Sequence, residues 1–415
     1  MLDIAEIRRQ FPILNRTIGG HPLIYLDSAA TTQKPKSVLD AMRDFYENHN
    51  GNVHRGMHIL AEESTVAYEN ARKVVQQFLG AANTDEVIFT KNCTEAINLV
   101  ARSLSKEWRD GDAIVLSTLE HHSNIVPWQQ LCERKGTEIF WVDIDDAGQM
   151  NLAELEKHLH KKSVKLVSIT GLSNVLGVLT PLKEIIAKAH DAGALVLVDA
   201  AQLSAHAPID VQKLDCDFLT FSGHKLYGPL GIGVLYGKRE ILKNMPPFLG
   251  GGMMIGEVHE DHFTPADPPA RFEAGTPPIA EAVGLAAAIE WLGRYSWKDI
   301  QAHESTLLIH AAAELQKIPG LHLLPILNSQ FPILNSPHSC LSFTIDDIHP
   351  HDLTDILGKK GICLRAGHHC AQPLHRRLGI TASTRLSVGI YNTKQEISTC
   401  ISAIAELAEQ WLTRK

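Results

Sequence analysis

Residues 194–225 read ALVLVDAAQLSAHAPIDVQKLDCDFLTFSGHK, and the fold class can be predicted from this stretch. Two apolar runs, Ala194–Asp199 and Phe218–Ser222, are hydrophobic at successive rather than alternate positions, which is typical of strands covered by helices on both faces. Polar residues follow both runs, Asp199 in the first case and Gly223-His224-Lys225 in the second. Because ligands of parallel α/β sheets bind beyond the carboxyl ends of the strands, we expect these residues to belong to a site.

Similar apolar runs lie on both sides of this stretch. Segments with helical character separate them, for example Thr94–Ser105, Asn124–Lys135 and Pro181–Ala192. The alternation of strands and helices predicts an α/β fold with a mainly parallel sheet. The seven predicted strands of this sheet are Glu86–Thr90, Ala113–Ser117, Glu138–Val142, Lys165–Thr170, Ala194–Asp199, Phe218–Ser222 and Gly233–Tyr236.

The pattern changes towards the C-terminus, where a long helix is predicted over Ala280–Arg294. Fewer strands follow it, and a final helix has apolar residues at helical spacing, which indicates that one face packs on a core. We therefore predict a large domain over residues 23–295, a smaller α+β domain over residues 296–415, and an N-terminal segment, residues 1–22, that packs with the small domain. The strands predicted in the small domain are Cys340–Ile345, Ile362–Arg365 and Arg385–Gly389.

Composition and charge argue against several classes of protein. The 415 residues include 39 Lys+Arg and 47 Asp+Glu, and the net charge of −8 argues against a broad basic surface for nucleic acid or anionic membranes. No run of roughly 18 apolar residues is present, so we expect no transmembrane helix. The N-terminus, MLDIAEIRRQFPIL, lacks the pattern of a secretory signal. Seven cysteines without a CxxC motif do not predict a disulfide framework, and we expect a cytoplasmic protein.

Lys225 and Asp199 together suggest a cofactor site. A single lysine is ordinarily a surface residue, and an aspartate before Ala200-Ala201-Gln202 can simply cap a helix. A buried acid can instead hold a protonated pyridine nitrogen, and a desolvated lysine can form a Schiff base. These are two of the protein groups that a pyridoxal phosphate site needs.

Two further loops follow predicted strands at the same edge of the sheet. The segment Thr90–Ala96 leads into a helix, and a helix N-terminus with the hydroxyl of Thr94 can bind a phosphate, although N-capping explains the threonine equally well. In the segment Glu120–Asn124, the imidazole of His121 can stack on a planar cofactor ring. Paired histidines also bind metals, but no cysteine or carboxylate lies at a ligand-like spacing, and we predict no metal site.

Nine motifs, in this order, resemble those of the group II cysteine desulfurases, the family of SUF/Csd-type desulfurases and selenocysteine lyases. The resemblance covers nearly the whole chain. SGHK alone indicates only the broader class V aminotransferase-like fold, whereas RAGHHCA with an arginine downstream is specific to this family. The motifs are LDSAATTQKP (26–35), TEAINLVA (94–101), EHHSNIVPW (120–128), SNVLG (173–177), VDAAQ (198–202), SGHKLYGP (222–229), FEAGTP (272–277), RAGHHCAQPL (365–374) and TRLSVGIYNT (384–393).

The resemblance implies an enzyme of pyridoxal 5′-phosphate fold type I that works as a homodimer. By motif, Lys225 is the Schiff-base lysine, Asp199 pairs with the pyridinium nitrogen, and Gln202 touches the ring hydroxyl. His121 stacks on the ring and assists proton transfer, with Asn174 nearby. The residues implied at the phosphate are Thr94, Cys93, Ser222, His224 and, for the phosphate of the other subunit, Thr276.

Cys370 is the predicted nucleophile. It lies in the loop Gly367–Pro373, where two histidines precede it, and nearby donors or positive charge favour a thiolate. From the residues alone, a nucleophile and an ordinary loop cysteine are equally good interpretations. The resemblance implies that Cys370 takes sulfur from L-cysteine as a persulfide and leaves L-alanine. The cysteines predicted at core or buried-strand positions are Cys132, Cys216, Cys340, Cys363 and Cys400.

The resemblance also implies a substrate pocket and a sulfur acceptor. Arg385 is the implied clamp for the substrate carboxylate, with Arg365, Asn174, His54 and Arg55 at the same pocket, although a surface ion pair is the ordinary role of an arginine. A SufE- or SufU-like acceptor protein would receive the sulfur for iron–sulfur cluster assembly. L-selenocysteine would serve as a second substrate.

Three other functions remain open. Another class V pyridoxal phosphate aminotransferase or lyase would not need Cys370, a scaffold protein of the sulfur pathway would bind the cofactor without turnover, and a His/Cys protein would bind a metal.

Two features depart from the family pattern. Cys93 stands where small or hydroxyl residues are more usual, and PILNS is duplicated at 325–329 and 332–336, which predicts an insertion in a surface loop or a partner-contact loop.

Overall fold

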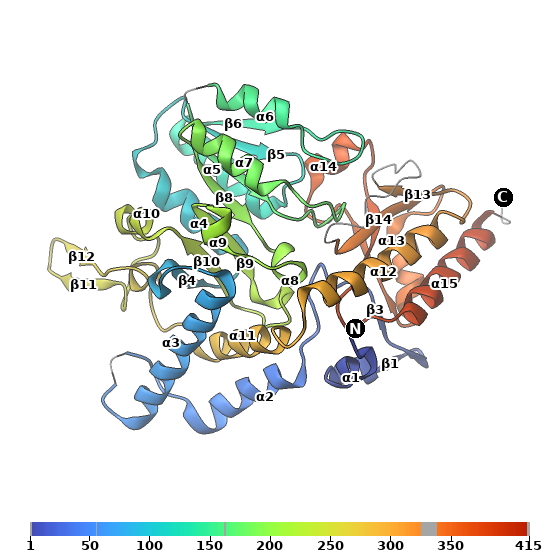
Figure 1. Cartoon of the computed structure of the whole chain (residues 1–415), viewed down its shortest axis with the longest axis horizontal. Helices are drawn as coiled ribbons and strands as arrows, with labels where there is room; N and C mark the ends of the chain where they lie inside the picture. Colours follow the sequence, from blue (N-terminus) through green and yellow to red (C-terminus); the bar gives the residue numbers. More distant parts are fainter. Residues whose placement is uncertain (1, 55, 162, 325–337, 413–415) are drawn as a thin grey trace.

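The computed structural model describes residues 2–54, 56–161, 163–324 and 338–412, so Arg55 and the duplicated PILNS segment lie outside the described residues. A seven-stranded sheet forms the centre of the large lobe (Figure 1). Its strand order is β4-β10-β9-β8-β7-β5-β6, and β10 runs antiparallel to both of its neighbours while the other pairs are parallel. The strands are β4 Val87–Thr90, β5 Ala113–Ser117, β6 Glu138–Val142, β7 Val164–Thr170, β8 Leu195–Asp199, β9 Phe218–Ser222 and β10 Gly233–Gly237.

All seven predicted strands are present, and the prediction of an α/β fold with a mainly parallel sheet is confirmed. Every residue of β4, β5 and β9 is buried, because successive side chains point to opposite faces and both faces are covered. On one face, Ile88 and Leu116 pack with helices α4 and α5. On the other face, Phe89 and Val115 pack with residues of α3, α7 and α11. The helices of this lobe are α2 Lys36–Asp44, α3 Ile59–Leu79, α4 Cys93–Ser103, α5 Val126–Lys135, α6 Leu152–Leu159, α7 Leu182–Asp191, α8 Leu203–His206, α9 Val211–Leu214, α10 Arg239–Asn244 and α11 Ile279–Leu292.

A four-stranded antiparallel sheet, in the order β13-β14-β17-β16, forms the small lobe with its own hydrophobic core. The predicted strand Ile362–Arg365 is wrong as a single element. Residues Ile362–Cys363 (β15) pair in parallel with β3, whereas Arg365–Gly367 (β16) pairs with β17 in the four-stranded sheet. The elements of this lobe are α12 Trp297–Leu315, β13 Leu321–Leu324, β14 Cys340–Ile345, α13 Pro350–Lys359, β15, β16, α14 Gln372–Arg377, β17 Ser383–Ser387 and α15 Lys394–Leu412.

The N-terminal segment contacts both lobes. Helix α1 (Ile4–Arg9) and the residue Phe11 contribute to the core of the large lobe. The Arg8 guanidinium donates to the backbone oxygen of Tyr391 at 2.7 Å, near the start of α15, and β3 (Ile24–Tyr25) pairs with β15. A short hairpin of β1 (Thr17–Ile18) and β2 (His21–Pro22) lies between them. The domain boundaries predicted at residues 22/23 and 295/296 stay predictions.

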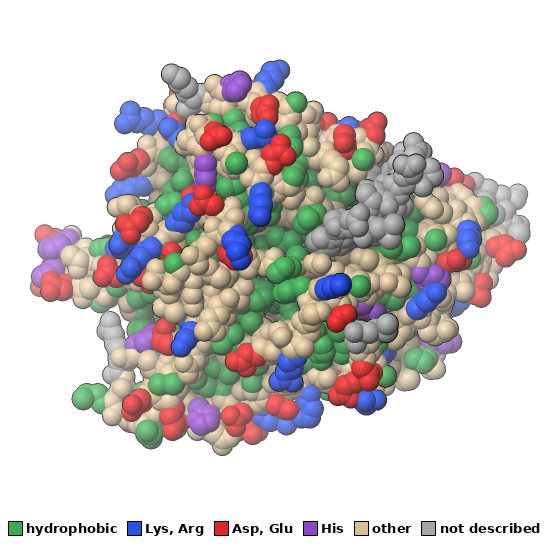
Figure 2. Space-filling model, viewed as in Figure 1, with side chains coloured by type: hydrophobic (Ala, Val, Ile, Leu, Met, Phe, Trp, Pro, Cys, Tyr) green, Lys and Arg blue, Asp and Glu red, His purple; other side chains and the backbone are tan. Residues whose placement is uncertain are grey.

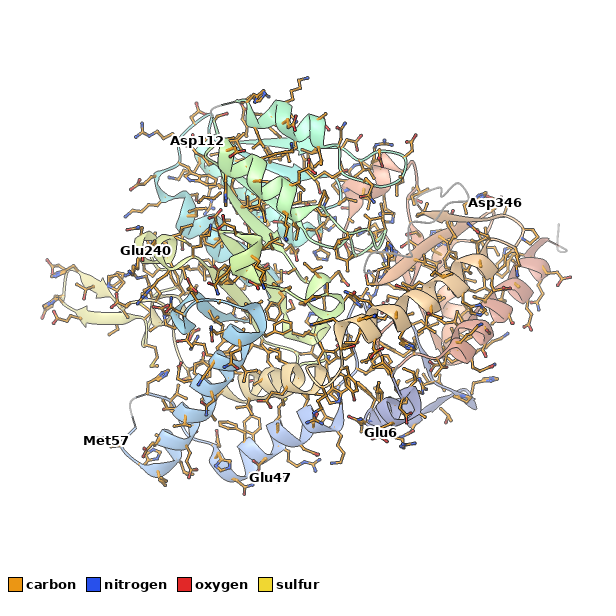
Figure 3. The ribbon with its side chains drawn as sticks, in the orientation of Figure 1. Glu6, Glu47, Met57, Asp112, Glu240 and Asp346 are labelled. Atoms are coloured by element: carbon orange, nitrogen blue, oxygen red, sulfur yellow. The ribbon has the colours of Figure 1, made fainter. Side chains whose placement is uncertain are left out.

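The outer surface carries both signs of charge. On the face drawn in Figure 2, Lys and Arg side chains are interspersed with Asp and Glu side chains. A hairpin of β11 (Ile255–Val258) and β12 (Phe263–Pro265) projects from the large lobe (Figure 1). Figure 3 places Met57 at the outer edge of this lobe, and its side chain is fully exposed. Within the described ranges, no helix combines the length and the apolar character needed to cross a membrane.

Candidate active site

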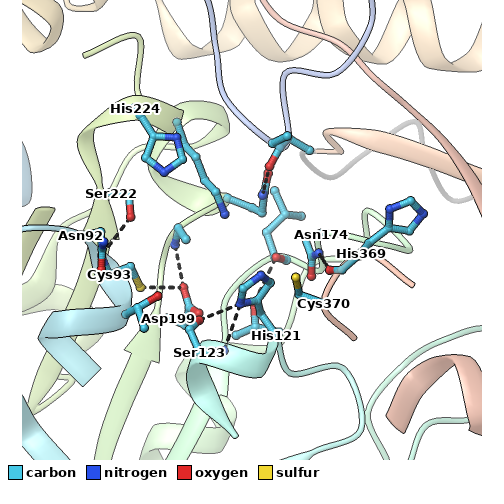
Figure 4. Close-up of a pocket in the computed structure, with 18 of the residues that line it drawn as sticks. Asn92, Cys93, His121, Ser123, Asn174, Asp199, Ser222, His224, His369 and Cys370 are labelled. Atoms are coloured by element: carbon cyan, nitrogen blue, oxygen red, sulfur yellow. Dashed lines mark hydrogen bonds between the residues drawn. The ribbon is translucent and has the colours of Figure 1, made fainter. Parts of the chain in front are cut away.

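A cavity of about 320 Å³ opens beyond the carboxyl ends of β4, β5, β7, β8 and β9, and residues of the small lobe close it (Figure 4). Its volume is that of a small-molecule site. Loops that are far apart in the sequence supply its walls, as the strand pattern predicts. The predicted site residues that line it are Cys93, Thr94, His121, Asn174, Asp199, Gln202, Ser222, His224, Lys225, Arg365, Cys370 and Arg385.

Two predicted residues do not line this cavity. The His54 ring lies 3.0 Å from Oε1 of Glu69 on α3, and His54 is not among the residues that line the cavity. Thr276 lines a separate cavity of about 130 Å³ together with Glu273. The role of His54 in substrate binding, and that of Thr276 at the phosphate of a second subunit, stay predictions.

Lys225 and Asp199 both line the cavity, and their charges interact. Lys225 ends a single 3-10 turn, Gly223–Lys225, directly after β9, and Asp199 is the last residue of β8. Burial lowers the pKa of Lys225, which favours the neutral amine, and the charge of Asp199 opposes this effect. Burial also raises the pKa of Asp199, opposed by the charge of Lys225. Each group therefore stabilises the charged form of the other, which burial has deprived of stabilisation by water.

Cys93 lies directly behind Asp199. Its Sγ is 3.4 Å from Asp199 Oδ1 and 2.9 Å from Thr220 Oγ1, while the backbone N–H of Ala201 donates to the same Oδ1 at 2.9 Å. Burial and the charge of Asp199 raise the pKa of Cys93 well above its ordinary value, so the group stays a thiol and donates to the carboxylate. The backbone N–H of Cys93 donates to Ser222 Oγ at 2.9 Å. Cys93 is thus built into the wall as a hydrogen-bond donor and not as a nucleophile.

His121 carries a neutral ring into the cavity. Burial, followed by the charge of Lys225, lowers the pKa of His121 to about 3. Its Nδ1 accepts the backbone N–H of Ser123 at 3.1 Å and lies 2.8 Å from Ser123 Oγ. Because Nδ1 accepts from a backbone N–H, the ring proton resides on Nε2. Figure 4 shows the ring with Asp199 and Cys370 on either side of it in this view.

Two arginines share one carboxylate at the small-lobe wall. Asp27 accepts from Arg365 at 3.0 Å (Nε to Oδ1) and 2.8 Å (Nη2 to Oδ2), and from Arg385 Nη2 at 3.2 Å. Arg385 is buried, and its Nη1 donates to the backbone oxygen of Asn174 at 2.9 Å. Its Nε has no hydrogen-bond partner among the described residues. Arg385 therefore lines the cavity with a guanidinium that is only partly paired, which suits an incoming carboxylate.

Sequence reasoning did not single out Asp27 as a site residue. It follows the apolar residues 23–26, the same signal of an acid directly after a buried run that identified Asp199. Ser123, which orients His121, was also missed, because a serine in a turn has no distinctive pattern.

Cys370 lies on a loop held in an unusual backbone conformation. His369 and Cys370 have φ angles of 49° and 55°, in the left-handed region that non-glycine residues avoid. The Asn174 side-chain amide donates to the backbone oxygen of His369 at 2.8 Å, which fixes this part of the loop against the large lobe. All seven cysteines lie in the described ranges, and Cys370 is the exposed one. The loop therefore presents a reachable thiol at the cavity.

The residues fit pyridoxal 5′-phosphate. A lysine and a buried acid line the same cavity of suitable size, and these are the groups that a Schiff base and a protonated pyridine nitrogen require. His224 Nδ1 is buried without a hydrogen-bond partner among the described residues, and it lies in the wall with the hydroxyls of Thr94 and Ser222. Such a set of donors suits a phosphate.

Comparison with known proteins agrees with this geometry. The aminotransferase class-V family model matches residues 24–399. The "Probable cysteine desulfurase" of Streptomyces coelicolor is 46% identical over 412 residues, covering 97% of both chains, and the cysteine desulfurase of Dickeya dadantii is 45% identical over 403 residues, covering 97% of this chain and 96% of the relative. The crystal structure of the cysteine desulfurase CsdA (S-sulfonic acid) from Escherichia coli superimposes with a TM-score of 0.89 at 39% identity, covering 99% of both chains.

This chain belongs to the cysteine desulfurase family of class-V aminotransferase-like proteins. The family predicted from the motifs is thereby confirmed, together with the predicted fold and the cofactor class, pyridoxal 5′-phosphate. The roles of individual residues, the sulfur acceptor and the oligomeric state are not tested by these similarities.

Proposed function

We propose that this protein is a pyridoxal 5′-phosphate-dependent cysteine desulfurase in which Cys370 takes the sulfur of L-cysteine as a persulfide. The observation that carries the proposal is an exposed cysteine at the cavity that also contains Lys225 and Arg385. The similarity to proteins named cysteine desulfurases over nearly the whole chain supports it. An aminotransferase or another lyase would need no thiol at this position.

The cofactor would be held from both ends. Asp199 would keep the pyridine nitrogen protonated, and Lys225 would form the Schiff base. The bound cofactor supplies an electron sink for negative charge at the α-carbon of the substrate. The residues proposed to hold it are Lys225, Asp199, Gln202, His121, Asn174, Thr94, Cys93, Ser222 and His224, and Thr276 would serve the second subunit of a homodimer.

Arg385 would bind the carboxylate of L-cysteine. Its unpartnered Nε and its place among the residues that line the cavity with Lys225 support this role. Arg365 lines the same wall and neutralises Asp27, so the carboxylate of the substrate does not meet an unpaired acid. Because burial lowers the pKa of Lys225, its Nζ can act as a base that takes the proton from the α-carbon.

Cys370 would attack the substrate sulfur as a thiolate. The bond between the β-carbon and the sulfur breaks, its electron pair stays with the β-carbon, and a bond forms between that sulfur and Cys370 Sγ. The proton on Lys225 Nζ and the proton released by the Cys370 thiol complete the product, L-alanine, and the neutral ring of His121 assists the transfer as a hydrogen-bond donor through Nε2. L-cysteine and the Cys370 thiol thus become L-alanine and a Cys370 persulfide, with atoms and electrons balanced and no external oxidant.

The persulfide would then be passed to an acceptor. We expect a SufE- or SufU-like protein, iron–sulfur cluster assembly as the destination, and a cytoplasmic location. L-selenocysteine would also be accepted, since the same residues bind its carboxylate and its carbon–selenium bond breaks more easily.

The test measures both products. Purified protein is incubated with the cofactor, L-cysteine and a thiol reductant, and sulfide and L-alanine are quantified for the unaltered protein, Cys370→Ala and Lys225→Ala. We expect equal amounts of both products from the unaltered protein and neither product from the two variants.

Two results would contradict the proposal. Undiminished alanine from Cys370→Ala would remove Cys370 from the reaction. No alanine from the unaltered protein, even with an acceptor protein present, together with transfer of the amino group to a keto acid, would identify a class V aminotransferase instead.

A further inference from the structure

The loop that carries Cys370 is attached to the large lobe through His122, the second histidine of the EHH motif. The backbone N–H of His122 donates to the backbone oxygen of Cys370 at 2.7 Å. Two positions further along the chain, the backbone N–H of Gln372 donates to His122 Nε2 at 3.1 Å. One residue of the loop after β5 therefore contacts the chain at Cys370 and again two positions later.

The second contact satisfies an amide that the small lobe leaves without a cap. Gln372 is the first residue of α14, and the first amides of a helix have no partner within the helix. Ala371, at the capping position, has no side chain that can accept, and Pro373 has no N–H. The imidazole of His122 thus accepts a hydrogen bond from an amide in the first turn of α14, as the side chain of a serine or aspartate cap does in many helices.

The ring of His122 is in the state that this contact requires. Burial, followed by the charges of His368 and Arg376, lowers the pKa of His122 below its ordinary value, so the ring is neutral near pH 7. A neutral ring that accepts at Nε2 carries its proton on Nδ1. The ring of His368 packs against it, with 5.5 Å between ring centroids.

The backbone of the loop needs such an attachment. His369 and Cys370 are both left-handed, and for L-residues this conformation costs roughly 1–2 kcal/mol per residue. Neither position is a glycine, the residue that adopts the left-handed conformation freely. Contacts from outside the loop must therefore hold it, and His122 makes two of them, at the Cys370 backbone oxygen and at the Gln372 amide.

We propose that His122 is a positioning residue that fixes the Cys370 loop by capping α14 from the opposite lobe. It does not line the cavity, and it acts on the reaction through the placement of the Cys370 thiol. This inference rests on the proposed role of Cys370 as the nucleophile.

Hydrogen–deuterium exchange measures the attachment without relying on turnover. In His122→Ala, the peptide that contains the Gln372 amide should exchange roughly 3- to 10-fold faster, as expected from the loss of one hydrogen bond. His122→Gln should restore most of the protection, because the side-chain oxygen of glutamine can occupy the position of Nε2. The remote control is His310→Ala, which removes a ring whose Nε2 lies 2.9 Å from Ser398 Oγ and should leave this peptide unchanged.

Kinetics and cofactor absorbance then separate positioning from general damage. In His122→Ala, kcat for alanine formation should fall about 10-fold. The KM for L-cysteine, the cofactor content and the thermal unfolding midpoint should stay close to those of His310→Ala. The variant His122→Gln should recover kcat. Unchanged exchange at Gln372 together with unchanged kcat would overturn the inference. No alanine from the unaltered protein would instead contradict the proposed function, and faster exchange in His122→Ala would still be measurable in that case.

Discussion

Arg385 is the side chain whose charge and shape both matter in the proposed reaction. It is buried, two of its nitrogens are held by Asn174 and Asp27, and Nε is left over. A lysine would keep the charge and lose the planar fork that binds a carboxylate at two points.

We therefore predict that Arg385→Lys lowers kcat/KM for L-cysteine about 10- to 100-fold, because a hydrogen bond to a charged group contributes about 1.5–3 kcal/mol. Steady-state rates of alanine formation measure this effect. Cofactor content should stay unchanged, and a kcat/KM within about twofold of the unaltered protein would exclude Arg385 as the clamp.

Several site residues can be predicted from the sequence because they follow buried strands. Asp199 and Lys225 come directly after apolar runs, and the sheet brings such positions to one edge. The pairing of Asp27 with Arg385 has no such signal, since the two residues are 358 positions apart and come from different elements. Physical reasoning on single segments cannot predict that contact, whereas the resemblance to a family predicted a role for Arg385.

At the scale of elements, one buried asparagine holds the turn after β5. Asn124 Nδ2 donates to Glu120 Oε2 at 2.7 Å, and its Oδ1 accepts from Trp128 Nε1 at 3.0 Å and from Ser168 Oγ at 2.5 Å. The turn is thereby tied to α5 and to β7. Because the turn carries His121, its position depends on this network.

We predict that Asn124→Ala lowers the free energy of unfolding by about 3 kcal/mol, because it leaves buried polar groups without partners at about 1–3 kcal/mol each. Chemical denaturation measures the change. The matched control is Asn98→Ala, in which the lost bond to the Thr94 backbone oxygen is exposed, and we expect a change below about 0.5 kcal/mol. Equal effects in the two variants would show that the network does not stabilise the turn.

The limits of prediction at this scale are visible in the small lobe. The apolar runs of the large sheet predict its strands closely, because both faces are covered. β17 begins at Ser383, two residues before the predicted start, since Ser383 and Thr384 are polar and yet buried. Ser383 Oγ lies 3.0 Å from His369 Nε2 and 3.1 Å from His375 Nε2, and this use of a polar side chain in a core cannot be detected from hydrophobicity.

At the scale of the whole molecule, buried histidines couple stability to pH. Burial lowers the pKa of His369 to about 2, of His121 to about 3 and of His224 to about 4. Below the ordinary value near 6.5, the unfolded chain takes up protons at these rings while the native protein does not. The free energy of unfolding should therefore fall as the pH decreases from about 6.5 towards 4, by up to about 1.4 kcal/mol per pH unit for each ring.

His369→Gln should make this decline shallower by about 1 kcal/mol per pH unit, measured by denaturant unfolding at a series of pH values. The exposed His262→Gln serves as the control and should give a curve parallel to that of the unaltered protein. A curve for His369→Gln that is parallel to both would contradict the coupling.

The assembled site depends on contacts between the lobes. The cavity wall combines Lys225 of the large lobe with Cys370 and Arg385 of the small lobe. The sequence alone predicts two units and the residues that each contributes. How they meet follows from side-chain packing across the whole chain, which local patterns do not encode.

In the proposed reaction, Cys370 carries the sulfur. The most direct measurement is mass spectrometry of the Cys370 peptide after the cofactor-loaded protein has been incubated with L-cysteine, without reductant and with an alkylating reagent that traps persulfides. We predict one additional sulfur atom on Cys370, none on the other six cysteines, and an amount of L-alanine equal to the modified protein. L-alanine formed without a persulfide on Cys370, or with the sulfur on another cysteine, would show that Cys370 is not the sulfur-accepting nucleophile.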